Sequence, residues 1–162
     1  MSGAILGLSL ATAAAEPPRD LPVNVSAERG DYDAERGATH LRENIHITRG
    51  DLEVHADEGY AYSSDGRYER VELLGSPARW SNLSSEGETT RGEADRIVYE
   101  LATDRVIMIG NARIQDSRGA FSGNRVVYDV DNERLEGDGG VQLTIEPEAR
   151  ADRDDESDPD PD

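Results

Sequence analysis

The chain contains an internal repeat with a constant offset of 29 residues. The segment Ala94–Ile114 aligns without a gap on Gly123–Leu143, so that Arg96-Ile97-Val98-Tyr99 falls on Arg125-Val126-Val127-Tyr128. Glycines also recur at this step: Gly30 with Gly59, Gly37 with Gly66, and Gly110 with Gly139. A fixed period in the range of ~20–50 residues predicts stacked repeats, in which each unit buries its apolar face only against its neighbours.

Short runs of alternating apolar and polar residues fill the repeats. Residues 52–56, Leu-Glu-Val-His-Ala, show the pattern, which has the two-residue period of a half-buried strand. Turns rich in Gly, Asp and Ser separate the runs. We therefore predict an all-β fold, an antiparallel β-jellyroll or open solenoid of repeated strand pairs. A short helix near Leu21 to Gly30 is the one non-β element considered.

Composition narrows the class of protein. The 162 residues contain no cysteine, which excludes disulfides, thiolate nucleophiles and Cys-based zinc sites. The net charge of −18 argues against nucleic acid as a partner, because neutralising phosphates requires basic residues. Residues 1–15 have the small apolar run and Ala-Ala-Ala end typical of a secretory signal peptide. Residues 16–145 are predicted to form the folded domain, and the acidic tail 146–162 is predicted to be disordered.

The chain shows no catalytic motif, nucleotide-binding loop or metalloprotease motif, so we predict a protein that is not an enzyme and takes no cofactor. His46 and His55 occupy outward positions of alternating runs, and the third histidine is His40. The His55-Ala56-Asp57 run offers two metal ligands, whereas zinc sites take three or four. We therefore expect solvated surface histidines and no metal site.

Residues on the inward side of the alternating runs are predicted to line an elongated apolar interior, and an ordinary core role is the alternative for each taken singly. Trp80 stands out because it follows a Pro-Ala-Arg segment near a long loop, where an interior could open to a ligand. The inward residues are Val54, Trp80, Ile97, Tyr99, Leu101, Val106, Met108, Val126 and Tyr128.

Three stretches carry a family resemblance: Glu43–Asp57, Gly75–Trp80 and Gly92–Asn111. They are similar to the Gly-Asn-Val…Gly-x-Ile-x-Ala-Asp, Gly-x-Pro-Ala-x-Phe and Ala-Asp-x-x-x-Tyr…Gly-Asn patterns of the LptA/OstA family of periplasmic lipopolysaccharide-transport proteins. The likeness covers Leu21 to Ile145, and the last pattern is fairly specific because it recurs.

The resemblance implies a β-jellyroll whose interior accepts the acyl chains of lipid A. Its ligand-facing positions fall on Val23, Val25, Trp80, Tyr99 and Leu101. It implies a periplasmic carrier that passes lipopolysaccharide from an inner-membrane complex to the outer-membrane translocon.

The resemblance also implies partners at the two ends of the sheet. The N-terminal strand, with Val23 and Val25, would pair with an inner-membrane LptC-like component. The C-terminal strand, with Val141, Leu143 and Ile145, would pair with the next protomer in head-to-tail self-association or with an outer-membrane LptD-like translocon.

The strong negative charge departs from what a carrier of a phosphorylated glycolipid suggests. Salt screens exposed charges beyond ~10 Å at 0.1 M, whereas burial of each methylene contributes ~0.8 kcal/mol, so apolar burial should dominate the affinity. Arg79, Arg96 and Arg113 are candidates to meet the phosphates. The alternatives within the same pathway are a membrane-anchored partner and the N-terminal domain of the translocon. The alternatives outside it are a structural β-repeat protein (filament or adhesin) without lipid cargo and a β-helical polysaccharide-active enzyme.

Overall fold

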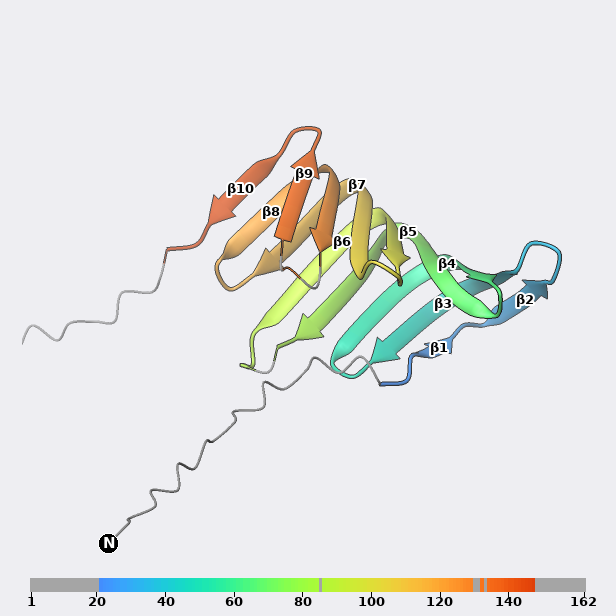
Figure 1. Cartoon of the computed structure of the whole chain (residues 1–162). Coiled ribbons are helices and arrows are strands. Elements are labelled where there is room, and N and C mark those ends of the chain that lie inside the picture. The colour runs from blue at the N-terminus through green and yellow to red at the C-terminus, as the bar shows by residue number, and fades with distance from the viewer. Residues whose placement is uncertain (1–20, 85, 130–131, 133, 148–162) are drawn as a thin grey trace, which may run out of the picture.

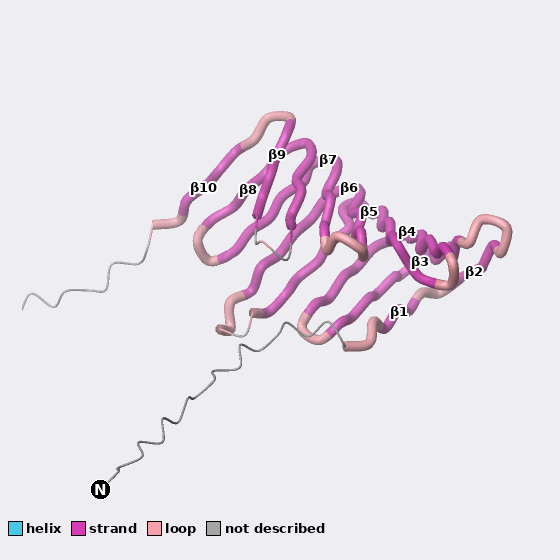
Figure 2. The backbone as a smooth tube through the Cα atoms, viewed as in Figure 1, coloured by secondary structure: helices cyan, strands magenta, loops and turns pink. Residues whose placement is uncertain are grey.

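The structure is a computed structural model that describes residues 21–84, 86–129, 132 and 134–147. The predicted signal peptide at 1–15 and residues 148–162 of the predicted acidic tail lie outside the described residues. The described chain folds as β-strands joined by short loops (Figure 2). The strands are β1 (Asn24–Ser26), β2 (Arg29–Asp33), β3 (Ala38–Arg49), β4 (Leu52–Ser64), β5 (Arg67–Leu83), β6 (Thr89–Glu100), β7 (Arg105–Asp116), β8 (Gly119–Asp129), β9 (Arg134–Asp138) and β10 (Gln142–Ile145).

All these strands belong to one antiparallel sheet in the order β1-β3-β4-β5-β6-β7-β8-β10, with β2 beside β3 and β9 beside β8. Figure 1 shows them as one row, from β1 at one end to β10 at the other. Successive strands therefore pair with each other along most of the chain. This arrangement confirms the predicted open, repeated antiparallel β-structure.

The expectation of a helix near Leu21 to Gly30 is wrong. This segment contains β1 and the start of β2, and β1 pairs with residues 46–48 of β3. Pairing with an existing strand satisfies the backbone of the segment, and this tertiary contact outweighs its weak local preference. Within the described residues, no helix is long and apolar enough to cross a membrane.

The long strands bend at one common level. The register shifts between Arg42 and Ile45 in β3, between His55 and Glu58 in β4, and between Leu74 and Ala78 in β5. Further shifts follow in β6 and β7 at the same level. Such irregularities bend a strand and increase its twist. We call this line the crease; it divides the sheet into a β1/β10 half and a β2/β9 half.

The repeat has a structural counterpart in the backbone. Gly37 and Gly66, one offset apart, have φ values of 58° and 75° and lie in turns. Gly110 and Gly139 have φ values of 81° and 76° and lie at the level of the crease. A positive φ is open to glycine without steric cost. The 29-residue period therefore repeats the turns and bends as well as the apolar pattern.

The core lies between the two halves. Ile45, Met108 and Val126 are its largest fully buried side chains. Small buried residues follow the crease: Ala56, Ala78, Ala94 and Ala112 are 8%, 0%, 0% and 1% exposed. A close-packed interior accepts little extra volume at such positions.

Candidate functional site

A row of cross-strand neighbours crosses the inner face of the β1/β10 half from one edge of the sheet to the other. Val54 and Trp80, in the middle of the row, are each 8% exposed, whereas the end residues Val25 and Leu143 are 48% and 65% exposed. The paired residues of this first inner row are Val25, Ile47, Val54, Trp80, Gly92, Ile114, Phe121 and Leu143.

Two parallel rows lie on the inner face of the β2/β9 half. The second inner row, beside the crease, includes Ile97, Met108 and Val126, which are all buried. The third inner row, farther from the crease, includes Tyr99, Val106 and Tyr128, which are half-buried. The third row therefore forms a partly solvated rim of the interior, and Leu101 follows it in the adjoining turn, half-buried.

Trp80 joins the two halves across the interior. Its indole N–H donates a hydrogen bond to Sδ of Met108 at 3.4 Å, and its ring stacks on Tyr128 with 6.4 Å between ring centroids. The predicted interior residues that lie on strands thus share one face, since β-strand side chains alternate between faces. The structure places Val23 and Val25 at its exposed N-terminal end.

Tyr99 gives the rim an amphipathic group. Burial, together with the hydrogen bond that its hydroxyl donates to the Asp104 carboxylate, raises the pKa of Tyr99 to about 12. The phenol therefore stays neutral at physiological pH. A neutral phenol can border an apolar ligand while its hydroxyl remains bonded at the wet edge.

The three arginines suggested as phosphate contacts lie on the outer face. Arg79 Nε is 3.6 Å from Glu93 Oε2, and Arg96 donates a 2.6 Å hydrogen bond to Glu72. Arg113 lines an outer hollow of about 360 Å³. These three arginines therefore lie on the opposite face of the sheet from the apolar interior.

Several interior residues were missed by sequence reasoning. Ile45, Ile47 and Leu73 are buried in the same core, as are the alanines of the crease. The alternation of Ile45 and Ile47 around His46 was a sufficient signal for two of them. Ala56 continues the alternation of residues 52–56. Ala78, Ala94 and Ala112 carried no such signal, because a small residue can be assigned to the interior only once the bend is known.

Both ends of the sheet expose apolar residues. Ile114 and Leu143 occupy equivalent repeat positions, yet Ile114 is 6% exposed and Leu143 is 65% exposed. The difference arises because β10 has a neighbour on one side and β7 on both. At this edge Val141 and Ile145 are 45% and 74% exposed. At the opposite end Val23 is 52% exposed.

Comparisons with known proteins agree with this geometry. A family model described as LptA/(LptD N-terminal domain) LPS transport protein matches residues 24–134. The lipopolysaccharide export system protein LptA of Escherichia coli (strain K12) is 24% identical over 148 residues, which cover 89% of this chain and 80% of that protein. LptH of Pseudomonas aeruginosa is 26% identical over 129 residues, covering 78% and 73%.

A solved structure shares the fold. The crystal structure of LptH, the LptA-homologous periplasmic component of the lipopolysaccharide transport device of Pseudomonas aeruginosa, superposes with a TM-score of 0.74 at 20% sequence identity. The match covers 80% of this chain and 98% of the other chain.

Proposed function

Because this chain belongs to the family of LptA and LptD N-terminal-domain lipopolysaccharide-transport proteins, we propose that it is a non-enzymatic periplasmic carrier that binds lipopolysaccharide. The observation that carries the proposal is the continuous apolar inner face, whose first row crosses the sheet from Val25 to Leu143. Acyl chains laid along this face would lie at right angles to the strands and contact each repeat in turn.

Binding requires the two halves to separate, because Met108 and Val126 fill the interior of the structure. The half-buried third row, with Tyr99 and Tyr128, is where separation would begin. Burial of about ten methylenes contributes about 8 kcal/mol at ~0.8 kcal/mol each. This gain is large enough to offset rearranged contacts such as the stack between Trp80 and Tyr128.

Photocrosslinking tests the interior directly. A photoreactive residue is placed at Trp80 or Tyr99, and an outward residue, His55, serves as the control position. We expect lipopolysaccharide to be captured at the two inner positions and not at the control. Capture at His55 with none at Trp80 or Tyr99 would refute an interior groove, and capture at none of them would favour a β-repeat protein without lipid cargo.

The salt dependence of binding gives a second check. If acyl burial dominates, added salt or divalent cations should leave affinity unchanged or raise it, because they screen repulsion between the lipid phosphates and a chain of net charge −18. A steep loss of binding with salt would mean that charge attraction, through Arg79, Arg96 or Arg113, carries the affinity.

The proposal extends to assembly at the two edges of the sheet. Both edges expose apolar residues of the inner face and follow the same bend, since β1 and β2 cover the two parts of β3 while β10 and β9 cover the two parts of β8. Unpaired edges of this kind accept further strands.

Three partners fit these edges. An inner-membrane LptC-like component would pair at β1, with Val23 and Val25, and an outer-membrane LptD-like translocon would pair at β10. A second copy would join the β10 edge of one molecule to the β1 edge of the next.

A charge at the exposed edge tests the assembly. The Leu143→Asp variant is expected to lose head-to-tail association in sedimentation velocity, because pairing would bury the new carboxylate. Tyr68→Asp is the matched control, because Tyr68 is 56% exposed and lies on β5, which is away from both edges of the sheet. Association that survives in Leu143→Asp, or that is lost equally in the control, would refute the edge model.

A further inference from the structure

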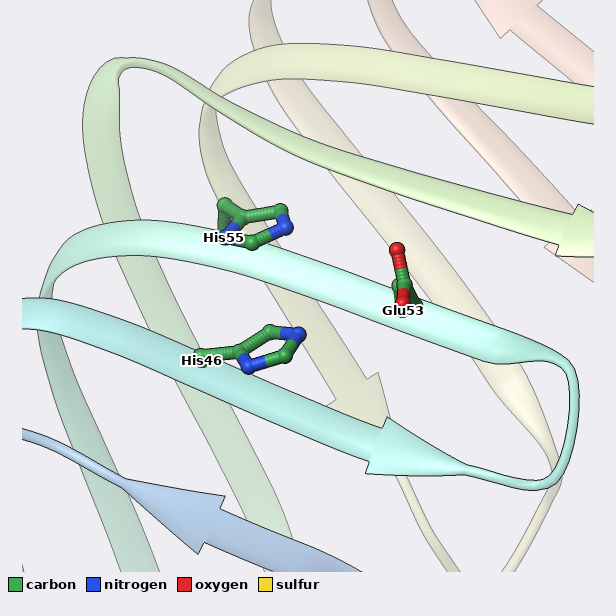
Figure 3. Close-up of side chains that lie close together, drawn as sticks. All are labelled: His46, Glu53 and His55. Carbon is green, nitrogen blue, oxygen red and sulfur yellow. The ribbon is translucent and has the colours of Figure 1, made fainter.

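The outer face carries a cluster of side chains that the transport function does not use. His46 on β3 pairs directly with His55 on β4, and Glu53 lies two residues before His55 on the same strand. Cross-strand partners share a face, as do residues two apart along a strand. Figure 3 shows the three side chains on the same side of the β3–β4 hairpin.

The three side chains are close enough to share one ligand. A ring nitrogen of each histidine and a carboxylate oxygen of Glu53 all lie within 4.8 Å of one another. The two imidazole rings are parallel, with centroids 4.5 Å apart and an interplanar angle of 5°. Figure 3 shows a nitrogen of each ring turned toward the Glu53 side of the pair.

Two of these groups lack partners among the residues that the structure describes. The Nε2 atom of His46 is buried and has no hydrogen-bond partner among the described residues. A buried polar atom without a partner is unfavourable and is uncommon in folded proteins. In the described part of the chain, the Glu53 carboxylate makes no side-chain hydrogen bond or ion pair either. An external cation would satisfy both groups.

The donor set indicates the class of cation. Two imidazoles and one carboxylate form a set that zinc takes in proteins, and a three-residue set leaves a fourth position for water or an exogenous ligand. Bonds of ~2.0–2.1 Å in tetrahedral geometry place ligand atoms about 3.3 Å apart. The exposed Glu53 and His55 side chains can make this approach by rotamer changes, without moving the strands.

The surroundings allow a cation to enter. Glu53 and His55 line the outer hollow of about 360 Å³, which gives access from solvent. Arg91 and Arg113 line the same hollow and are positively charged, as a cation is. Arg79 lies beside the site as the cross-strand partner of His55. Its guanidinium is directed to Glu93, with 3.6 Å between Nε and Oε2, and this pairing reduces its repulsion of a cation.

We propose that His46, Glu53 and His55 form a site for a divalent transition-metal ion of the zinc class. The ion would join β3 to β4 beside the edge strand β1. From the sequence we expected no metal site, because the His55-Ala56-Asp57 run offers only two ligands. The register brings in the other ligands: a two-residue turn at Gly50 and Asp51 pairs Arg49 with Leu52 and hence His46 with His55.

Titration of the full chain with Zn²⁺ alone tests the site by calorimetry, with imidazole proton NMR as a second readout. We expect one Zn²⁺ per chain and shifted resonances for His46 and His55. His55→Ala and Glu53→Gln alter exposed side chains, so both variants should fold. Each should weaken binding at least ~10-fold, since even the loss of residues that only orient metal ligands costs ~10–100-fold.

His40→Ala is the matched control. His40 lies elsewhere on the sheet, with its Nε2 2.7 Å from Glu58 Oε1 and its ring stacked on Tyr60, so its removal should leave the Zn²⁺ affinity unchanged. Absence of Zn²⁺ binding by the native chain would overturn the proposal. Binding that persists in the His46→Ala/His55→Ala double variant would also overturn it, because the ion would then be held by the many acidic residues elsewhere.

Discussion

Gly92 sits under the Trp80 ring, and an alanine at this position should destabilise the fold by steric conflict. A Cβ atom on Gly92 would lie 2.1 Å from Trp80 Nε1 and 2.3 Å from Cε2. Ordinary contact begins near 3.4 Å, so the ring would have to shift by about 1.3 Å. The φ angle of Gly92 is outside the left-handed region, so alanine brings no backbone strain of its own.

The expected cost follows from what the shift of the ring disturbs. Overpacking a well-packed core costs ~1–3 kcal/mol. Displacing the indole also breaks its hydrogen bond to Met108 and leaves a buried N–H unsatisfied, at ~1–3 kcal/mol. Because part of the strain is relieved as the ring moves, we expect Gly92→Ala to lower the free energy of unfolding by about 2–4 kcal/mol.

Urea unfolding measures this loss, and the single tryptophan of the chain provides a fluorescence signal from the site itself. With a slope of about 2 kcal/mol per molar urea, the midpoint should fall by about 1–2 M. The control is a double-mutant cycle with Trp80→Leu, in which the unfolding of all four proteins is monitored by circular dichroism. The cost of Gly92→Ala should largely disappear in the Trp80→Leu background. Additive costs, or an unchanged midpoint, would refute the steric argument.

Three further predictions concern the interior, the rim and the outer face. Met108→Ala should cost about 2–5 kcal/mol in urea unfolding, toward the upper end because Met108 is 0% exposed; a cost below 1 kcal/mol would contradict a packed interior. The folded state raises the pKa of Tyr99 from 10.0 to about 12. The neutral phenol therefore contributes fully to the free energy of unfolding below pH 10, and this contribution is lost as the pH rises through 12. Tyr99→Phe should remove this part of the loss of stability at alkaline pH, as measured by thermal melts. An identical alkaline loss in the variant would argue against a perturbed phenol. Glu72→Ala should lower the free energy of unfolding by about 1–3 kcal/mol. This is less than the cost of breaking a fully buried ion pair, because its partners Arg70 and Arg96 are half-exposed and can be hydrated when Glu72 is removed. Stability equal to that of the native protein would show that the ion pairs contribute nothing.

The sequence predicted the positions of the strands better than the bends within them. The alternation of residues 52–56 and the 29-residue offset depend on local pattern, so the predicted β-structure and the inward direction of Val54 and Ile97 agree with the burial that the structure shows. Leu21 to Gly30 was misread because its strand state depends on pairing with β3, which a local reading does not contain.

The crease could not be derived from the sequence. It requires a positive φ at Asn44 and Asn111, residues with side chains, as well as at Gly110, so no single residue type marks it. The proximity of His46 to Glu53 could have been predicted, because a two-residue turn at Gly50-Asp51 is enough to fix the pairing of the two flanking strands. Whether the inward residues bind lipid remains a prediction, because burial alone does not distinguish a core from a ligand site.

The single row of strands also relates the length of the molecule to the number of its strands. Neighbouring strands lie ~4.8 Å apart, so the eight strands on the path from β1 to β10 span about 34 Å. One 29-residue repeat adds two strands, or about 10 Å of length, without changing the width of the sheet. The number of repeats therefore sets the length of the sheet, and the residues of each repeat set its width. Evolution can change one of these dimensions while the other stays fixed.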